Sequence, residues 1–140
     1  MTSRKNSQTI IKFYFYAEVS FGKGDKFGEK YHWSKDLLDK KIKAALTKNW
    51  GEIGCAYGAG EAEILYETIN LYKDKVIGKR ALVIGSVNPW VEAILIAIGA
   101  KHVTTLEYNQ IDSNHPQVTL MKNCSFVFTL NFYFSIEIDI

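Results

Sequence analysis

Residues 80–109 constrain the fold more than any other part of the chain, because two short β-prone runs flank a longer apolar segment. Ala81–Ile84 is apolar without alternation, which is typical of a strand covered on both faces of a parallel sheet. This run stops at Gly85, and a second β-prone run follows at His102–Leu106. A helical crossover of this length joins parallel strands with a right-handed connection. The order of strand, glycine turn, helix and strand therefore predicts an α/β fold.

The ends of this unit carry residues with defined roles at helix and strand boundaries. Asn88 is a good helix cap, Pro89 is tolerated in the first turn, and Gly99 suits the left-handed position that ends a helix. Glu107 follows the second strand at roughly the 20-residue spacing from Gly85 at which a carboxylate binds a cofactor ribose. In open α/β sheets, ligands bind at the edge formed by the carboxyl ends of the strands, where Gly85 and Glu107 are expected. The residues expected to converge there are Gly85, Ser86, Asn88, Trp90, Glu107, Tyr108 and Asn109.

The glycine spacing after the first strand narrows the choice of cofactor. In the G-x-G-x-x-G pattern of dinucleotide-binding turns, the three positions here hold Gly85, Val87 and Trp90. Val87 obstructs the close backbone approach that a pyrophosphate needs, so the turn disfavours NAD and FAD. S-adenosylmethionine has no pyrophosphate, and a turn with less glycine can accommodate it. The sequence therefore favours S-adenosylmethionine, with Gly85, Ser86 and Glu107 as candidate cofactor-binding residues.

Two helices are expected upstream, as an N-terminal helical extension packed on the sheet. Ser34 caps the first helix, whose apolar stripe faces the protein while its lysines face water. The second runs from Glu61 to about Lys73, and the glycines before it form a flexible joint, because Glu61 and Glu63 would repel a phosphate. The expected buried positions are Leu38, Ile42, Ala45 and Leu46 in the first helix and Leu65, Ile69 and Tyr72 in the second, with Lys40, Lys41 and Lys43 exposed.

The runs V-I-G-S-V-N-P-W-V-E-A (83–93) and G-A-K-H-V-T-T-L-E-Y-N (99–109), with the later His115-Pro116, resemble an uncharacterised domain-of-unknown-function family best represented in nematodes. The resemblance covers about residues 30–121, and that family in turn resembles class I S-adenosylmethionine-dependent methyltransferases. It implies a Rossmann-like, methyltransferase-type partial parallel sheet. It also implies that Gly85 and Ser86 lie under the methionine and ribose of the cofactor, and that Glu107 binds the ribose hydroxyls. Val83 stands where such enzymes usually carry an acidic residue.

Asp112 and His115 follow the second strand, and either residue type can act as a general base. Their neighbours are turn formers, and Pro116 restricts His115 to extended geometry. We therefore interpret this segment as a polar turn and assign no catalytic residue.

The composition changes at Asn123 to an apolar, β-prone run with four phenylalanines. Residues 109–122 leave little room for the crossover helix that a further parallel strand would need. A methyltransferase-like sheet also needs more strand–helix units than the chain supplies. We therefore hypothesise a C-terminally truncated product. Its expected divisions are an N-terminal strand and loop segment (1–33), the helical extension with the first half of a Rossmann-like domain (34–122), and a tail not native to that domain (123–140).

The charge and cysteine content of the chain argue against several classes of function. The chain has 17 basic and 15 acidic residues, so its net charge of +2 gives no signal for nucleic-acid binding. Cys55 and Cys124 lie far apart without a C-x-x-C pair, which argues against a disulfide framework and a metal site. No apolar stretch approaches the roughly 18 residues of a membrane span, and no secretory signal is evident. A cytoplasmic or nuclear location is expected.

The function expected from these features is that of a methyltransferase-like Rossmann domain whose activity is unknown and whose catalytic site is incomplete in this chain. The alternative is a non-catalytic interaction domain that keeps the fold without cofactor chemistry. The sequence leaves open whether the protein is an enzyme, which substrate it takes and what oligomeric state it adopts.

Overall fold

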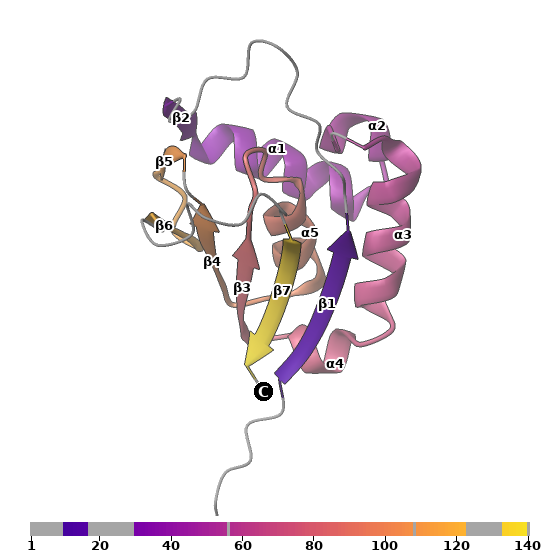
Figure 1. Cartoon of the computed structure of the whole chain (residues 1–140). Helices are drawn as coiled ribbons and strands as arrows, with labels where there is room; N and C mark the ends of the chain where they lie inside the picture. Colours follow the sequence, from indigo (N-terminus) through magenta and orange to yellow (C-terminus); the bar gives the residue numbers. More distant parts are fainter. Residues whose placement is uncertain (1–9, 17–29, 56, 108, 123–132, 140) are drawn as a thin grey trace, which may run out of the picture.

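The computed structural model of the chain describes residues 10–16, 30–55, 57–107, 109–122 and 133–139 (Figure 1). The strands are β1 (Ile10–Tyr16), β2 (Lys30–Trp33), β3 (Arg80–Ile84), β4 (His102–Glu107), β5 (Gln110–Ser113), β6 (Val118–Lys122) and β7 (Tyr133–Asp139). The helices are α1 (Lys35–Leu46), α2 (Trp50–Ile53), α3 (Ala59–Asn70), α4 (Lys73–Val76) and α5 (Trp90–Ile98). The architecture is mixed α/β, which confirms the predicted class.

The main sheet has five strands in the order β1-β7-β3-β4-β6. Strands β3, β4 and β6 are parallel, whereas β7 runs antiparallel to both β3 and β1. The predicted parallel pair is confirmed: β3 and β4 are joined through α5, and their register places Ile84 opposite Leu106. Strands β2 and β5 form a second, two-stranded parallel sheet.

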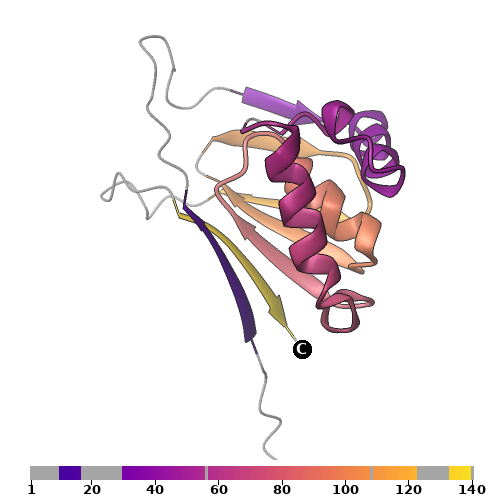
Figure 2. The ribbon, with the colours of Figure 1, turned by 90° about the vertical axis from the view of Figure 1, so that its right-hand side faces the viewer.

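The helices of the described part of the chain lie on one side of the main sheet, to the right of the strands in Figure 2. Helix α5 packs on β3 and β4, and α1 and α3 pack against α5. The burial of β3 therefore alternates: Ala81 and Val83 face the helices and are buried, whereas Leu82 and Ile84 are only half-buried. The two faces of β3 thus differ in burial, and the more deeply buried face is the one that carries the helical layer.

The hydrophobic core lies between this helical layer and the sheet. A second, smaller cluster joins β2, α1 and β6. The main cluster contains Ala44, Ala45, Ile53, Ala62, Leu65, Ile69, Val76, Ala81, Val83, Trp90, Val91, Ile94, Leu95, Ala100 and Val103. The smaller cluster contains Trp33, Leu38 and Val118.

Helix α1 begins as predicted but buries a different set of side chains. The Ser34 hydroxyl accepts a hydrogen bond from the backbone N–H of Leu37 at 3.1 Å, which confirms the cap. Leu46 is 60% exposed, so it was wrongly placed in the buried stripe. Lys41 was wrongly expected in water: it is only 7% exposed, and its ammonium donates to the carbonyl oxygen of Ile53. That carbonyl ends α2, so its partial negative charge makes burial of the lysine tolerable.

Helix α3 forms where the second helix was expected, although its end differs. It ends at Asn70, and Tyr72 lies beyond that end with 47% of its surface exposed, which corrects the predicted buried face. At its start, Gly58 takes φ +117°, a conformation that favours glycine.

Part of the segment predicted to be a polar turn, Asp112 and Ser113, belongs to β5, whereas residues 114–117 form no strand and lead into β6. Strand β6 pairs in parallel with β4, with Val118 opposite Val103. The connection between them contains no helix; it passes through β5, which pairs with β2 from the other end of the chain. The turn prediction was wrong only for Asp112 and Ser113, because pairing of β5 with a distant strand stabilises residues whose local sequence favours a turn.

Strands β1 and β7 place the two outer segments of the sequence in the same sheet. Strand β7 pairs with β3, with Ala81 opposite Ile138, and with β1, with Ile10 opposite Asp139. An antiparallel neighbour needs no crossover helix, so the short span before residue 123 does not prevent this pairing. Residues 1–33 and 123–140 thus each contribute a strand to the main sheet.

Two glycines allow a paired test of backbone and packing effects. Gly60→Ala should stabilise the protein by about 0.5 kcal/mol, because Gly60 lies in α3 with open space around an added Cβ. Gly99→Ala should destabilise it by about 1–3 kcal/mol, because φ is +123° and the new Cβ would lie 3.0 Å from Ile77 Cγ1. Urea unfolding measures both, and shifts of the same sign in the two variants would contradict this account.

Candidate functional site

Gly85 begins the turn between β3 and α5 at the edge of the sheet. Its φ of +78° lies in the left-handed region, where glycine is favoured. Its N–H donates to the carbonyl oxygen of Leu106 at 3.0 Å, so the turn starts beside the last residues of β4. Since Ile84 lies opposite Leu106, Gly85 and Glu107 follow at neighbouring strand ends. The two residues thus share one edge of the sheet, as the sequence predicted.

Ser86, the next residue of this turn, directs its hydroxyl toward the interior. It is 4% exposed, and its Oγ lies 3.0 Å from the carbonyl oxygen of Asn88 and 3.1 Å from Glu92 Oε2. Thr105, on β4, donates its hydroxyl to Glu92 Oε1 at 2.7 Å. The carboxyl group of Glu92 therefore links α5 to β4 and to the turn.

Glu92 is a buried polar residue at this site that the sequence analysis missed. It is fully buried, and burial raises its pKa from 4.5 to about 7; the nearby Glu107 adds to this rise, while the hydrogen bonds from Thr105 and Ser86 oppose it. A usable signal was present in the sequence, because Glu92 is the lone charged residue in the apolar helix W-V-E-A-I-L-I-A-I. A charged side chain in such a helix faces the core and needs partners there.

Glu107 lines a cavity of about 380 Å³ at the carboxyl end of β4. Its side chain is 4% exposed, and its Oε1 accepts from the backbone N–H of Asn109 at 3.2 Å and from Asn109 Nδ2 at 3.4 Å. The cavity walls come from β2, β5 and the ends of β4 and β6. They comprise Lys30, Tyr31, Glu107, Asn109, Gln110, Ile111, Asp112, Leu120, Met121 and Lys122.

The structure divides the predicted crevice into two parts. Glu107 and Asn109 line the cavity, whereas Gly85 and Ser86 lie at the neighbouring strand end, outside its lining. Asn88 points away from both, and its Nδ2 donates to the carbonyl oxygen of Gly54 at 2.6 Å. The buried ring of Trp90 contacts Tyr57 edge to face, with 6.4 Å between ring centres. Tyr108 lies outside the described residues.

The ammonium group of Lys41 lies beside this turn. A Cβ added at Gly54 would be 3.0 Å from Lys41 Nζ and 3.9 Å from Asn88 Nδ2, so both nitrogen atoms lie close to Gly54. Burial lowers the pKa of Lys41 and raises the pKa of the Cys55 thiol. The loop after α2 and the turn after β3 therefore meet around a buried cation.

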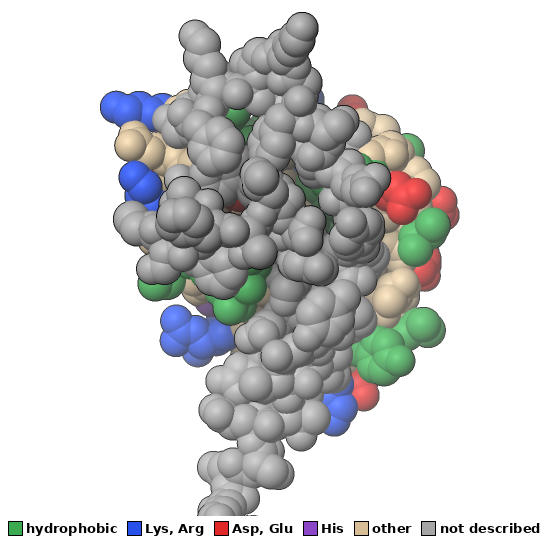
Figure 3. Space-filling view, viewed as in Figure 1, with side chains coloured by type: hydrophobic (Ala, Val, Ile, Leu, Met, Phe, Trp, Pro, Cys, Tyr) green, Lys and Arg blue, Asp and Glu red, His purple; other side chains and the backbone are tan. Residues whose placement is uncertain are grey.

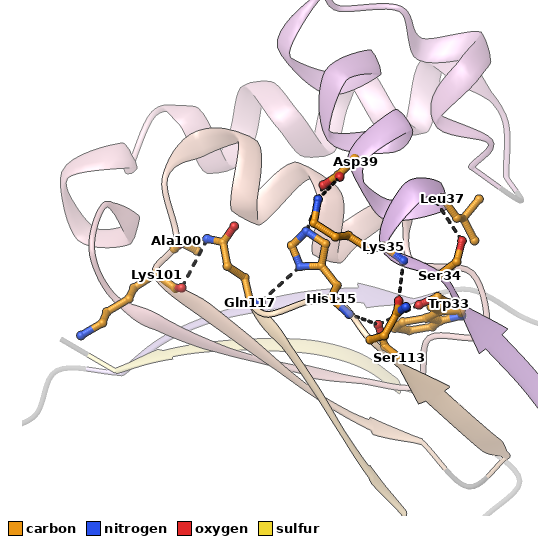
Figure 4. A network of polar contacts seen from close by, with 11 residues as sticks. Trp33, Ser34, Lys35, Leu37, Asp39, Ala100, Lys101, Ser113, His115 and Gln117 are labelled. Atoms are coloured by element: carbon orange, nitrogen blue, oxygen red, sulfur yellow. Dashed lines mark hydrogen bonds and ion pairs between the residues drawn. The ribbon is translucent and has the colours of Figure 1, made fainter.

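His115, considered as a general base, is held in a structural network instead (Figure 4). Its side chain is 3% exposed; Nδ1 accepts from the backbone N–H of Gln117 at 3.2 Å, and Nε2 lies 3.2 Å from Asp39 Oδ1. Because Nδ1 accepts, the ring hydrogen belongs on Nε2, which donates to Asp39. Both nitrogen atoms are thus engaged in joining the β5–β6 connection to α1. Asp112 is exposed and pairs with His32 Nδ1 at 2.8 Å.

The described residues give few other signs of a ligand. They contain no group of three His, Cys, Asp or Glu side chains placed to hold a metal ion, and no helix among them is long and apolar enough to cross a membrane. On the face in Figure 3, the coloured Lys and Arg side chains lie near the rim. The Gly85 edge and the Glu107 cavity therefore remain the leading site.

The comparisons with known proteins agree with the resemblance to a nematode family. Neither the curated proteins nor the solved structures yield a match. One family model does match, and its description reads "Caenorhabditis protein of unknown function, DUF268". The match begins before β3 and runs into β7. Residues 78–135 are thus similar to the DUF268 family, and the matched range includes the Gly85 turn, Glu92 and Glu107.

Proposed function

We propose that this domain binds S-adenosylmethionine at the edge where β3 and β4 end, in a methyltransferase-like arrangement. The observation that carries the proposal is the position of Glu107, a buried carboxylate at the end of a parallel strand that lines a cavity of about 380 Å³. A carboxylate in this position accepts hydrogen bonds from the two ribose hydroxyls of a nucleoside. The volume lies within the range of small-molecule pockets.

The side chains around the cavity fit a nucleoside group. Ile111, Leu120 and Met121 supply apolar surface for a flat base, and Tyr31 adds an aromatic ring. Asn109 fixes one oxygen of Glu107, so the carboxylate is oriented before any ligand arrives. Lys30 and Lys122 make the same cavity suitable for a ligand that carries a carboxylate.

The turn after β3 fits a ligand without phosphate groups. Val87 is 41% exposed at the position where a pyrophosphate requires glycine. The hydroxyl of Ser86 is engaged with Glu92 and Asn88, so contact between Ser86 and a ligand would come from its backbone. When bound, S-adenosylmethionine supplies a methyl group for transfer; in this proposal the chain itself binds and orients the cofactor.

Isothermal titration calorimetry with S-adenosylmethionine tests the proposal. We expect micromolar binding to the whole chain and a loss of about 10- to 100-fold in affinity in Glu107→Gln, because the charged acceptor is lost while an acceptor for Asn109 remains. Glu63→Gln, an exposed change in α3, is the matched control and should bind like the wild type. No binding up to millimolar cofactor would contradict the proposal.

A non-catalytic interaction domain is the second candidate. It is favoured by the inward hydroxyl of Ser86, which serves the protein interior instead of a ligand. It also agrees with the valine at position 83, which is fully buried in the core where methyltransferases usually carry an acidic residue. In this case, calorimetry would detect no binding by the folded wild-type chain.

A further inference from the structure

We infer that Glu92 carries a proton in the folded domain and that its ionisation withdraws a hydrogen bond from the turn between β3 and α5. The inference goes beyond the proposed cofactor site, since it concerns the turn itself and requires no ligand. It makes this turn a pH-sensitive element of the fold.

The geometry around Ser86 supports a protonated Glu92. A serine hydroxyl has one hydrogen, yet Ser86 Oγ lies within hydrogen-bonding distance of two oxygen atoms, those of the Asn88 carbonyl at 3.0 Å and of Glu92 Oε2 at 3.1 Å. If Glu92 were ionised, a single hydrogen would have to serve both acceptors. If Glu92 is protonated, its Oε2–H donates to Ser86 Oγ and Ser86 donates to Asn88. Each contact then has its own hydrogen.

The second oxygen of Glu92 fits the same assignment. Thr105 donates its hydroxyl to Oε1 at 2.7 Å, so the unprotonated oxygen of the carboxyl group has its own donor. The side chain is fully buried, and burial raises the pKa of Glu92 to about 7. A neutral carboxyl group with every hydrogen bond satisfied is the form that a low-dielectric interior favours.

The charged groups near Glu92 come from two elements, and they shift the pKa of Glu92 in opposite directions. Glu107, on β4, disfavours a second negative charge and raises the pKa of Glu92. Lys41, on α1, favours the ionised form, but its ammonium is directed to the carbonyl oxygen of Ile53. The other elements that pack on α5 present buried apolar side chains, namely Ala62, Leu65 and Ile69 from α3, Val76 from α4, and Ala81 and Val83 from β3.

Ionisation changes the hydrogen bonding of the turn. A carboxylate at position 92 draws the Ser86 hydrogen to itself, so the carbonyl oxygen of Asn88 loses the serine as a donor. It keeps the N–H of Trp90 at 2.8 Å. Since the Asn88 side chain also holds the carbonyl oxygen of Gly54, the change reaches the loop after α2. The protonation state of Glu92 thus changes the hydrogen bonding between the turn, α5 and the loop after α2.

Carbon-13 NMR of the wild-type chain tests the inference directly. We expect the Glu92 side-chain carboxyl carbon to titrate with a midpoint near pH 7, and the backbone carbonyl carbon of Asn88 to shift with the same midpoint. In Ser86→Ala, that shift of Asn88 should fall to half or less. A Glu92 midpoint below pH 5, or an Asn88 carbonyl that does not follow Glu92, would overturn the inference.

Unfolding measured against pH gives a second test. The folded-state pKa is raised above 4.5, so the unfolded chain releases the proton first as pH rises. The contribution of Glu92 to stability should therefore be lost between pH 4.5 and 7, which by itself raises the unfolding equilibrium constant by about two orders of magnitude.

A matched pair of variants isolates this contribution. Glu92→Gln can donate to Ser86 and accept from Thr105 without titrating, so the fall between pH 4.5 and 7 should disappear from its profile. Glu63→Gln, the exposed control, should keep it. Equal pH profiles for the wild type and Glu92→Gln would refute the inference, and neither result depends on cofactor binding.

Discussion

Trp33→Ala should lower the free energy of unfolding by about 3–5 kcal/mol, as expected for loss of a buried aromatic side chain. Trp33 is 2% exposed and packs in one cluster with Leu38 and Val118. Its indole N–H donates to the carbonyl oxygen of Val87 at 3.0 Å, so the same side chain ties β2 to the turn after β3. The truncation therefore removes apolar contacts from three elements and leaves a carbonyl of the turn without its donor.

Urea denaturation followed by circular dichroism measures this effect, and Trp33→Phe separates its two parts. Phenylalanine retains most of the apolar packing but cannot donate to Val87, so it should destabilise the chain by about 1–2 kcal/mol. Leu46→Ala is the matched surface control in α1, since Leu46 is 60% exposed, and it should cost less than about 0.5 kcal/mol. A cost below 1 kcal/mol for Trp33→Ala would show that this cluster contributes little to the fold.

The elements predicted correctly from the sequence are those stabilised by their own residues. The cap at Ser34 needs a hydroxyl and an N–H three residues later. The pairing of β3 with β4 follows from an apolar run, a glycine and a helix of sufficient length, all contiguous in the chain. Such local relations are visible in a single sequence.

The elements predicted wrongly depend on partners that are distant in the sequence. Strand β5 forms because β2 lies beside it, 80 residues earlier, where Lys30 pairs with Gln110. Lys41 has the same local surroundings as Lys40 and Lys43, yet only Lys41 reaches the end of α2 and becomes buried. A pattern of polar residues cannot distinguish these cases, since it contains no information on what packs against them.

In the candidate site, too, the features set by neighbouring residues could be predicted, whereas those set by distant residues could not. The spacing from Gly85 to Glu107 could be recognised, because both residues belong to one strand–helix–strand unit. The cavity could not, since its walls combine Tyr31 of β2 with Leu120 and Met121 of β6. The inward direction of the Ser86 hydroxyl also escaped prediction, although the lone Glu92 in an apolar helix pointed to a buried polar network.

The position of the hydrogen-bond network around Glu92 depends on how α5 packs. Truncating a buried side chain at the centre of α5 should therefore lower the free energy of unfolding about as much as truncating Trp33. Ile94 is fully buried in the main core, two residues after Glu92 on the helix that begins at the Gly85 turn. Ile94→Ala should lower the free energy of unfolding by about 2–5 kcal/mol, because it removes buried methyl groups and leaves a cavity between the helical layer and the sheet. Ile94→Val, which removes one methyl group, should cost about 0.5–1.5 kcal/mol.

Comparison of Ile94→Ala with Ile94→Val, together with a surface control, distinguishes loss of core packing from a general effect of shortening isoleucine. Ile64→Ala in α3 is the matched control: Ile64 is 57% exposed, and its truncation should change the urea midpoint little. If Ile94→Ala and Ile64→Ala shift the midpoint equally, α5 does not pack on the sheet as described. If Ile94→Ala destabilises the protein most, Ile94→Val less and Ile64→Ala least, the apolar face of α5 holds the helix that carries Glu92 in place. The network around Ser86 and Thr105 then rests on a rigid support, as a proton-dependent hydrogen bond of the turn requires.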